Sequence, residues 1–133
     1  MAKMQYRVLG TSGMKVSQLC LGTMMFGGPT EAGQAGRIID HALESGVNFI
    51  DTANVYTEGR SETAIGPAIK PKRNSWVLAT KVAQKTGPDV TDAGLSRRHI
   101  VQAVEASLKR LEVEHIDLYQ AHFFDAETPI EET

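Results

Sequence analysis

Strand-like and helix-like segments alternate along this chain, and this alternation constrains its fold more than any other feature. Four short runs have the composition of buried strands, at residues 18–22, 47–51, 76–81 and 116–122. Stretches with helical periodicity lie between them. Successive strands start about 30 to 40 residues apart, which is the size of a βαβ unit. Such units place parallel strands in a sheet that helices cover, so we expect an α/β protein.

Three helices are expected from apolar periodicity and from end signals. The first should end at Gly46, because glycine commonly follows the last helical residue. The second should run from Ser61, a candidate N-cap, through Ile69. The third should follow Ser96, with its apolar residues on one face. Those apolar residues are Ile100, Val104, Leu108 and Leu111.

Two architectures can hold these units: a doubly wound open sheet, or part of a (β/α)₈ barrel. No GxGxxG motif follows the first strand, which argues against a dinucleotide-binding Rossmann domain. Residues 6–18 are expected to form a β-hairpin around the turn GTSG, and such a hairpin can close the bottom of a barrel. We therefore expect part of a barrel. A flavodoxin-like four-stranded domain is the less favoured alternative.

Composition places the chain among ordinary globular proteins, with 41% hydrophobic and 23% charged residues. The net charge of −2 offers no electrostatic footprint for nucleic acid or an anionic membrane. No segment resembles a signal peptide or approaches the ~20 apolar residues of a membrane helix. Cys20 is the single cysteine, which excludes an intrachain disulfide and fits a reducing compartment. We expect a cytoplasmic protein.

Ionisable residues end three of the expected strands: Asp51, Lys81 and His122. Functional residues of parallel α/β proteins gather at this end of the sheet. Each residue alone also has a structural explanation, as a turn former, a solvated lysine or a hydrogen-bonded histidine. Their coincidence at one end favours a catalytic site. The other histidines lack metal-ligand spacing with one another, so no metal site is expected.

Tyr56, in the loop after Asp51, adds a fourth group to this end. A phenol is a weak proton donor, because its usual pKa is near 10. A lysine ammonium nearby favours the phenolate and so makes the phenol a better acid. An aspartate can hold that lysine, and a histidine can place a donor beside a substrate oxygen. Together these groups can give a proton to a carbonyl oxygen while a hydride arrives at its carbon.

The sequence resembles the aldo-keto reductases, a family of NADP-dependent (β/α)₈ barrels. The similarity runs through YRVLGTSGMKVSQLCLGTMMFGG, GVNFIDTANVYTEGRSE, VLATK and GLSRRHIVQAVEASLKRLEVEHIDLYQAH. The resemblance implies that Tyr56 is the general acid, that Lys81 and Asp51 tune it, and that His122 orients the carbonyl. The implied activity is reduction of aldehydes or ketones to alcohols.

The resemblance also implies an NADP(H) site. Gly22, Thr23 and Met24, together with Asp51, match positions on the nicotinamide side of the family's cofactor site. The implied substrate is a small carbonyl compound, whose identity depends on loops at the carboxyl face of the barrel. Later strands of the family hold the carboxamide and the phosphates of the cofactor, and this sequence has no match to them.

A barrel of this kind needs about 250 residues, so residues 1–133 are expected to be its N-terminal half. This half would comprise the hairpin and four strand/helix units, broken at the start of the fourth helix. Thr128 and Glu131 have capping-box spacing with Pro129 between them, which predicts a helix start there. The alternative is a non-catalytic half-barrel or a binding subunit resembling potassium-channel β subunits. Such a half-barrel can self-associate through its exposed strand edges. One departure from the family is Thr57, where many members have glycine.

Overall fold

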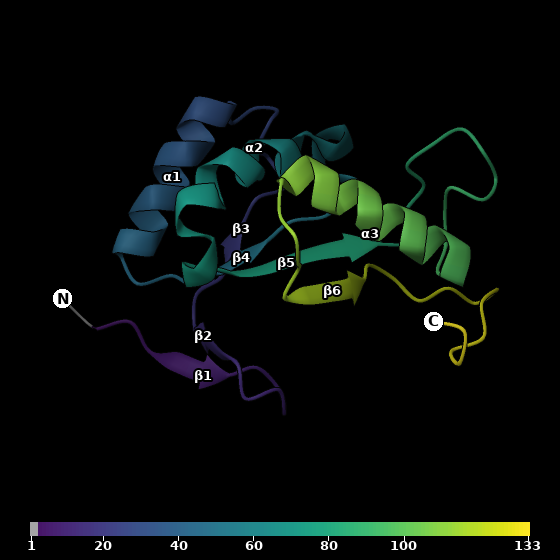
Figure 1. The fold of residues 1–133 in the computed structure, drawn as a ribbon, viewed down its shortest axis with the longest axis horizontal. Helices are drawn as coiled ribbons and strands as arrows, with labels where there is room; N and C mark the ends of the chain where they lie inside the picture. Colours follow the sequence, from purple (N-terminus) through teal and green to yellow (C-terminus); the bar gives the residue numbers. More distant parts are fainter. Residues whose placement is uncertain (1–2) are drawn as a thin grey trace.

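The three α-helices cover one face of a four-stranded parallel sheet, as the computed structural model of residues 3–133 shows (Figure 1). The strand order is β3-β4-β5-β6, so each strand pairs with the next along the chain. All four expected strands form, with ends within a few residues of the expected ones. Their bounds are β3 Leu21–Gly22, β4 Phe49–Asp51, β5 Val77–Val82 and β6 Leu118–Ala121. An unreversed order with helices on one face supports the barrel-type arrangement rather than the flavodoxin-like one.

The main hydrophobic core lies between the helices and the sheet. The helices are α1 Ala32–Glu44, α2 Arg60–Ile69 and α3 Arg97–Leu111, and 3₁₀ turns occupy Tyr56–Gly59 and Lys70–Ser75. Ile50 of β4 and Leu78 of β5 are neighbours in register and fully buried. Each helix contributes at least one fully buried residue to this core, among them Ile39, Ile65 and Leu111. Burial of a side chain of this size stabilises the fold by about 1.5–3 kcal/mol, so each helix is anchored on the sheet.

Two of the three expected helix signals act as expected. Gly46 adopts a φ of 90° after α1, and its N–H donates to Leu43 O, which ends the helix. Ser96 caps α3 by accepting a hydrogen bond from the His99 N–H at 3.2 Å. Both signals depend only on nearby backbone, which is why they can be read from sequence.

The expectation that Ser61 caps α2 is wrong. Ser61 lies inside the first turn and is fully buried, and Gly59 is the residue at the N-cap position. The Ser61 hydroxyl donates to Thr23 O at 2.8 Å and also lies 2.9 Å from Thr52 Oγ1. Partners distant in the sequence therefore take the hydroxyl away from the helix end.

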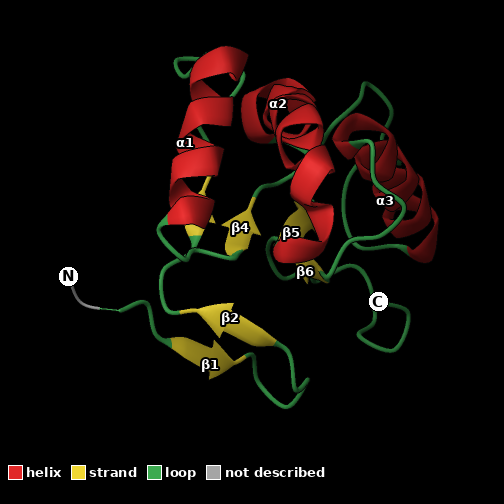
Figure 2. Cartoon of the chain, turned by 60° about the vertical axis from the view of Figure 1, so that its left-hand side comes forward, coloured by secondary structure: helices red, strands yellow, loops and turns green. Residues whose placement is uncertain are grey.

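The N-terminal hairpin pairs β1 Tyr6–Val8 with β2 Lys15–Ser17 in antiparallel register and lies apart from the main sheet (Figure 2). The Ser17 N–H donates to Asn48 Oδ1 at 2.7 Å, and Tyr6 Oη donates to Gly46 O at 2.8 Å. Asn48 directly precedes β4, so these bonds hold the hairpin at the amino ends of the parallel strands. The carboxyl ends are left open for other groups.

The expected helix start at Thr128 is also not formed. The Thr128 hydroxyl donates to Asp125 Oδ2 at 2.8 Å instead of capping a helix, and residues 129–132 form a turn closed by Glu132 N–H to Pro129 O at 3.0 Å. Asp125 also accepts from the Leu95 N–H at 2.8 Å. This carboxylate thus competes for the capping hydroxyl and ties the segment to the loop before α3.

The face of the sheet opposite the helices carries no second layer within residues 3–133 (Figures 1 and 2). Phe49 and Leu118 point to this face by alternation with the core residues and are only partly buried. None of the helices in the described part of the chain is long and apolar enough to cross a membrane.

Candidate active site

Asp51 and Lys81 meet at the carboxyl ends of neighbouring strands β4 and β5. Asp51 is in register with Ala79, two residues before Lys81, so both ionisable side chains rise from the face opposite the helices. Lys81 Nζ lies 2.6 Å from Asp51 Oδ2, and both side chains are mostly shielded from solvent. The pair is therefore a short charge-assisted hydrogen bond in a partly desolvated position.

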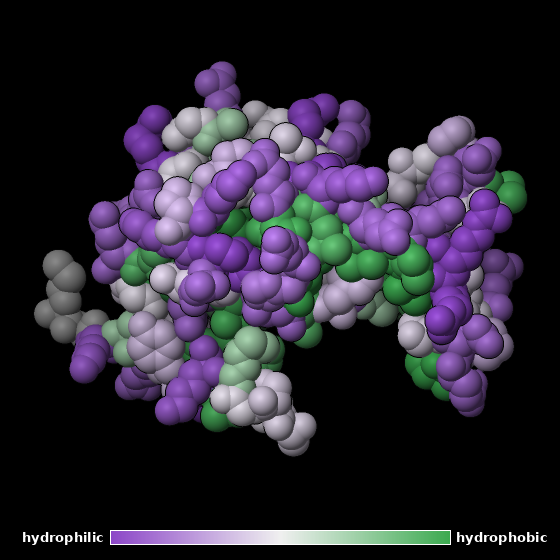
Figure 3. Space-filling model, viewed as in Figure 1, coloured by the Kyte–Doolittle hydropathy of each residue, from purple (hydrophilic) through white to green (hydrophobic). Residues whose placement is uncertain are grey.

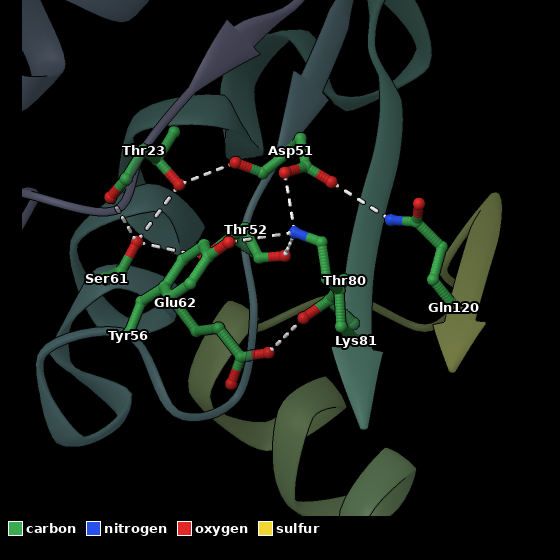
Figure 4. A network of polar contacts seen from close by, with 9 residues as sticks. All are labelled: Thr23, Asp51, Thr52, Tyr56, Ser61, Glu62, Thr80, Lys81 and Gln120. Carbon is green, nitrogen blue, oxygen red and sulfur yellow. Dashed lines mark hydrogen bonds and ion pairs between the residues drawn. The ribbon is translucent and has the colours of Figure 1, made fainter. Parts of the chain in front are cut away.

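The Lys81 ammonium donates to three acceptors (Figure 4). These are Asp51 Oδ2 at 2.6 Å, Thr52 O at 2.8 Å and Tyr56 Oη at 3.2 Å. An ammonium has three N–H donors and no acceptor, so this set uses all of them. The phenol oxygen of Tyr56 therefore accepts from Lys81, and its own O–H proton is left to be given to another group.

Tyr56 begins a sharply turned loop after β4. Three consecutive residues have positive φ: Thr57 at 47°, Glu58 at 58° and Gly59 at 85°. The left-handed conformation is costly for residues with a Cβ. The Thr57 hydroxyl donates to Phe26 O at 2.7 Å, which helps to hold the turn. This conformation explains physically why glycine would also suit position 57.

His122 lies directly after β6, and its ring stands almost perpendicular to that of Tyr56, at 83° with centroids 5.8 Å apart. Its backbone N–H donates to Val82 O at 2.8 Å, which fixes the position of the residue. Burial and the positive charge of Lys81 lower the pKa of His122, against the opposing effect of Asp51. The imidazole is therefore neutral at neutral pH and offers one donor and one acceptor nitrogen. Its Nδ1 is buried and has no hydrogen-bond partner among residues 3–133.

The structure thus brings together all four residues that the sequence predicts to be catalytic. It also adds Gln120, whose Nε2 donates to Asp51 Oδ1 at 3.0 Å. Alternation along the strand places Gln120 on the same face as His122, but that pattern alone does not reveal the bond to Asp51, 69 residues away.

A cluster of hydroxyl groups supports the backbone under the site and was not expected from the sequence. Thr23 Oγ1 donates to Asp51 O at 2.8 Å, and Ser61 links Thr23 to Thr52. Asp51 and Thr52 both supply acceptors to Lys81. The cluster therefore fixes the strand end that holds the lysine.

The residues expected on the nicotinamide side lie beside Asp51, on and after β3. Gly22 is in register with Asp51 and is exposed, with no atom within 4 Å of where a Cβ would stand. Met24 is 59% exposed, whereas Thr23 is buried with its hydroxyl engaged. Gly22 and Met24 are thus open to solvent, and Thr23 supports the strand end from below. Within residues 3–133, no group of three or more metal-ligating side chains gathers.

Known proteins match this chain over nearly its whole length. Residues 18–133 match the sequence profile of the Aldo/keto reductase family. A probable voltage-gated potassium channel subunit beta of Arabidopsis thaliana is 45% identical over 98% of this chain and 40% of its own length. The uncharacterized oxidoreductase YrpG of Bacillus subtilis is 44% identical, over 97% of this chain and 43% of its own.

A solved structure shows the same fold. The aldo-keto reductase AKR11C1 from Bacillus halodurans, in its holo form, superimposes with a TM-score of 0.84 at 40% identity. The match covers 97% of this chain and 43% of that one, so the four parallel strands and three helices correspond to part of a (β/α)₈ barrel. The chain spans about two fifths of the length of these relatives. Its sequence and its fold place it in the aldo/keto reductase family.

Proposed function

We propose that this chain carries the proton-donating part of an NADPH-dependent carbonyl reductase that converts aldehydes or ketones to alcohols. The observation that carries the proposal is the hydrogen-bonded series Asp51–Lys81–Tyr56, with distances of 2.6 Å and 3.2 Å. A phenol that accepts from an ammonium and keeps its own proton is arranged to act as a general acid.

Each member of the group has a role set by its contacts. Tyr56 gives its proton to the carbonyl oxygen, and the Lys81 ammonium stabilises the phenolate that remains. Asp51 holds that ammonium in place through a 2.6 Å contact. His122, neutral and beside the Tyr56 ring, orients the carbonyl oxygen through a nitrogen donor. The alcohol forms when the oxygen has received this proton and the carbon has received a hydride.

The hydride is the contribution of a reduced nicotinamide dinucleotide when it is bound. The surface of Gly22 and Met24 beside Asp51 would hold its nicotinamide ring. We further propose that residues outside 1–133 complete the contacts to the phosphates, since the matched relatives are more than twice as long. Titration of the 133-residue chain with NADPH, followed by fluorescence, is therefore expected to give weak or no quenching. Saturation in the micromolar range would contradict this part of the proposal.

A chimera tests the catalytic assignment. Residues 1–133 would replace the matching segment of the Bacillus halodurans reductase, and the oxidation of NADPH would be followed with an aldehyde that the parent enzyme reduces. We expect turnover that depends on Tyr56. A folded chimera that binds NADPH but gives no turnover would overturn the assignment.

A second candidate function is that of a binding subunit, because two similar proteins each carry the name probable voltage-gated potassium channel subunit beta. They come from Arabidopsis thaliana, at 45% identity, and from rice, at 41%. Within residues 3–133 the open sheet ends at the edge strands β3 and β6, each paired on one side. Phe123 and Phe124, which follow β6, are exposed. Hydrophobic residues are also exposed among hydrophilic ones across the middle of the molecule (Figure 3). These features favour self-association, and a strictly monomeric species in sedimentation velocity would argue against it.

A further inference from the structure

The two carboxylate oxygens of Asp51 have different partners on different strands. Oδ2 accepts from Lys81 of β5 at 2.6 Å, and Oδ1 accepts from Nε2 of Gln120 of β6 at 3.0 Å (Figure 4). Both donors come from the face opposite the helices, and Lys81 and Gln120 are in register with each other. The carboxylate is thus held from two directions.

This arrangement restrains a torsion that is otherwise loose. The terminal torsion of an aspartate is broad and roughly two-fold, so a single bond from Lys81 would let the carboxylate rotate and exchange its oxygens. A second donor on the other oxygen restricts that rotation. The amide of Gln120 is neutral, so it can donate a hydrogen bond to Oδ1 while Lys81 remains the only positive partner of the carboxylate in this set of contacts.

The sheet leaves room for this long-range contact at Ala79. Ala79 of β5 is in register with both Asp51 of β4 and Leu118 of β6, so it lies between Asp51 and the strand of Gln120. It is fully buried and has only a methyl group. A larger side chain at this position would stand in the path from Gln120 to Asp51.

We propose that Gln120 is a positioning residue, which fixes the Asp51 carboxylate so that Oδ2 stays on Lys81 and Lys81 stays on Tyr56. The effect of Gln120 on turnover rests on the proposed carbonyl reduction. Its effect on Lys81 does not, because it depends only on the hydrogen bonds of the folded chain.

The first test observes Lys81 without any catalysis. The ¹H–¹⁵N signal of the Lys81 ammonium would be recorded by NMR in the 133-residue chain, with the amide spectrum as the check of folding. We expect Gln120→Met, similar in size but without the donor, to speed hydrogen exchange of this ammonium. The matched control Gln102→Met, at an exposed position of α3, should leave it unchanged. An unaltered Lys81 signal in folded Gln120→Met would overturn the proposal.

The second test separates positioning from simple packing in the chimera described above. Gln120→Met should lower kcat about tenfold or more, as expected for a misplaced catalytic group, with little change in the KM for the carbonyl compound. Gln120→Glu keeps the size but turns a donor into a negative charge beside Asp51, so it should be worse than Gln120→Met. If Gln120→Glu equals the parent chimera, the proposal fails. A chimera inactive even with Gln120 present would count against the proposed function instead, and the NMR result would still decide the role of Gln120.

Discussion

The Lys81 ammonium donates to the Tyr56 phenol oxygen across 3.2 Å, and its other two N–H groups are taken by Asp51 and Thr52. The lysine has no donor left for a substrate. In the proposed reaction, it would act through the charge it places beside Tyr56 and through the position in which it holds the phenol. Substrate contact would then be left to the phenol proton and to His122.

Replacement of Tyr56 by phenylalanine removes the proposed proton donor and keeps the ring. In the chimera, Tyr56→Phe should lower kcat for carbonyl reduction by about 10²- to 10⁴-fold, the usual contribution of a general acid. NADPH binding, followed by fluorescence quenching, should stay nearly the same. Tyr6→Phe, in the hairpin at the other end of the sheet, is the matched control and should retain activity. If Tyr56→Phe abolished cofactor binding, Tyr56 would have a different role.

Glu62 and Arg110 join α2 to α3 beneath the site. The Glu62 side chain is fully buried and accepts from Thr80 at 2.6 Å and from Arg110 Nε at 2.7 Å. Arg110→Met would leave the buried carboxylate without its cation and should destabilise the protein by about 3–5 kcal/mol in urea unfolding. The control Lys70→Met breaks the exposed pair with Glu112 and should cost about 1 kcal/mol or less. Equal losses in the two variants would contradict this account.

Patterns that are local or periodic predicted most of this fold, and contacts between distant segments account for the rest. Strand alternation placed Asp51 and Lys81 at one sheet end, and local end signals located α1 and α3. The local signal at Ser61 gave a wrong N-cap for α2, because the Ser61 hydroxyl bonds to Thr23 and Thr52 instead. A local sequence pattern depends only on residues that are close in the chain. It therefore does not predict a hydrogen bond to a residue that only folding brings near.

Gln120 and Thr128 also show that local patterns do not predict contacts between side chains. Alternation placed Gln120 on the face of His122 but gave no sign of its bond to Asp51, which lies two strands away in the sheet. Thr128 carried a clear helix-start signal, but its hydroxyl donates to Asp125 instead. The residues of the candidate site were thus predictable from their places at strand ends and in the loop after Asp51, whereas the contacts of Gln120 and Thr128 were not.

Two histidines should make the protein less stable at mildly acidic pH. Burial is the largest cause that lowers the pKa of both His99 and His122 in the folded protein. Below the ordinary histidine pKa of about 6.5, the unfolded chain therefore binds more protons than the folded one, and the free energy of unfolding falls as pH falls. Urea midpoints measured at pH 7 and pH 5 should show this loss.

The pH effect can be assigned to one residue by substitution. His99→Gln removes a titrating group that is buried and whose Nε2 has no partner within residues 3–133. The variant should show a smaller drop in urea midpoint between pH 7 and pH 5 than the parent. An unchanged drop would exclude His99 as a source of the effect.

Cys20 should react slowly with alkylating reagents although it is exposed. Partial burial of the thiol and the negative charge of Asp51 raise the pKa of Cys20 from 9.0 to about 11, against the opposing charge of Lys81. Since the thiolate is the reactive form, the rate with iodoacetamide at pH 8 should be about a hundredfold below that of a cysteine in a short peptide. Mass spectrometry measures this rate. Asp51→Asn should speed the reaction, and an equal rate in the two proteins would contradict the role of Asp51.

Two substitutions of Thr57 test whether the turn after Tyr56 is strained. Its φ of 47° costs a residue with a Cβ about 1–2 kcal/mol, which glycine avoids. Thr57→Ala loses the hydrogen bond to Phe26 O and keeps the strain, whereas Thr57→Gly loses the bond and relieves it. The glycine variant should therefore be more stable than the alanine variant by about 1 kcal/mol in urea unfolding.

Thr63, exposed within α2, is the matched control: there glycine should be less stable than alanine by about 1 kcal/mol, because helix interiors favour alanine. The same order at both positions would mean that the turn holding Tyr56 is unstrained.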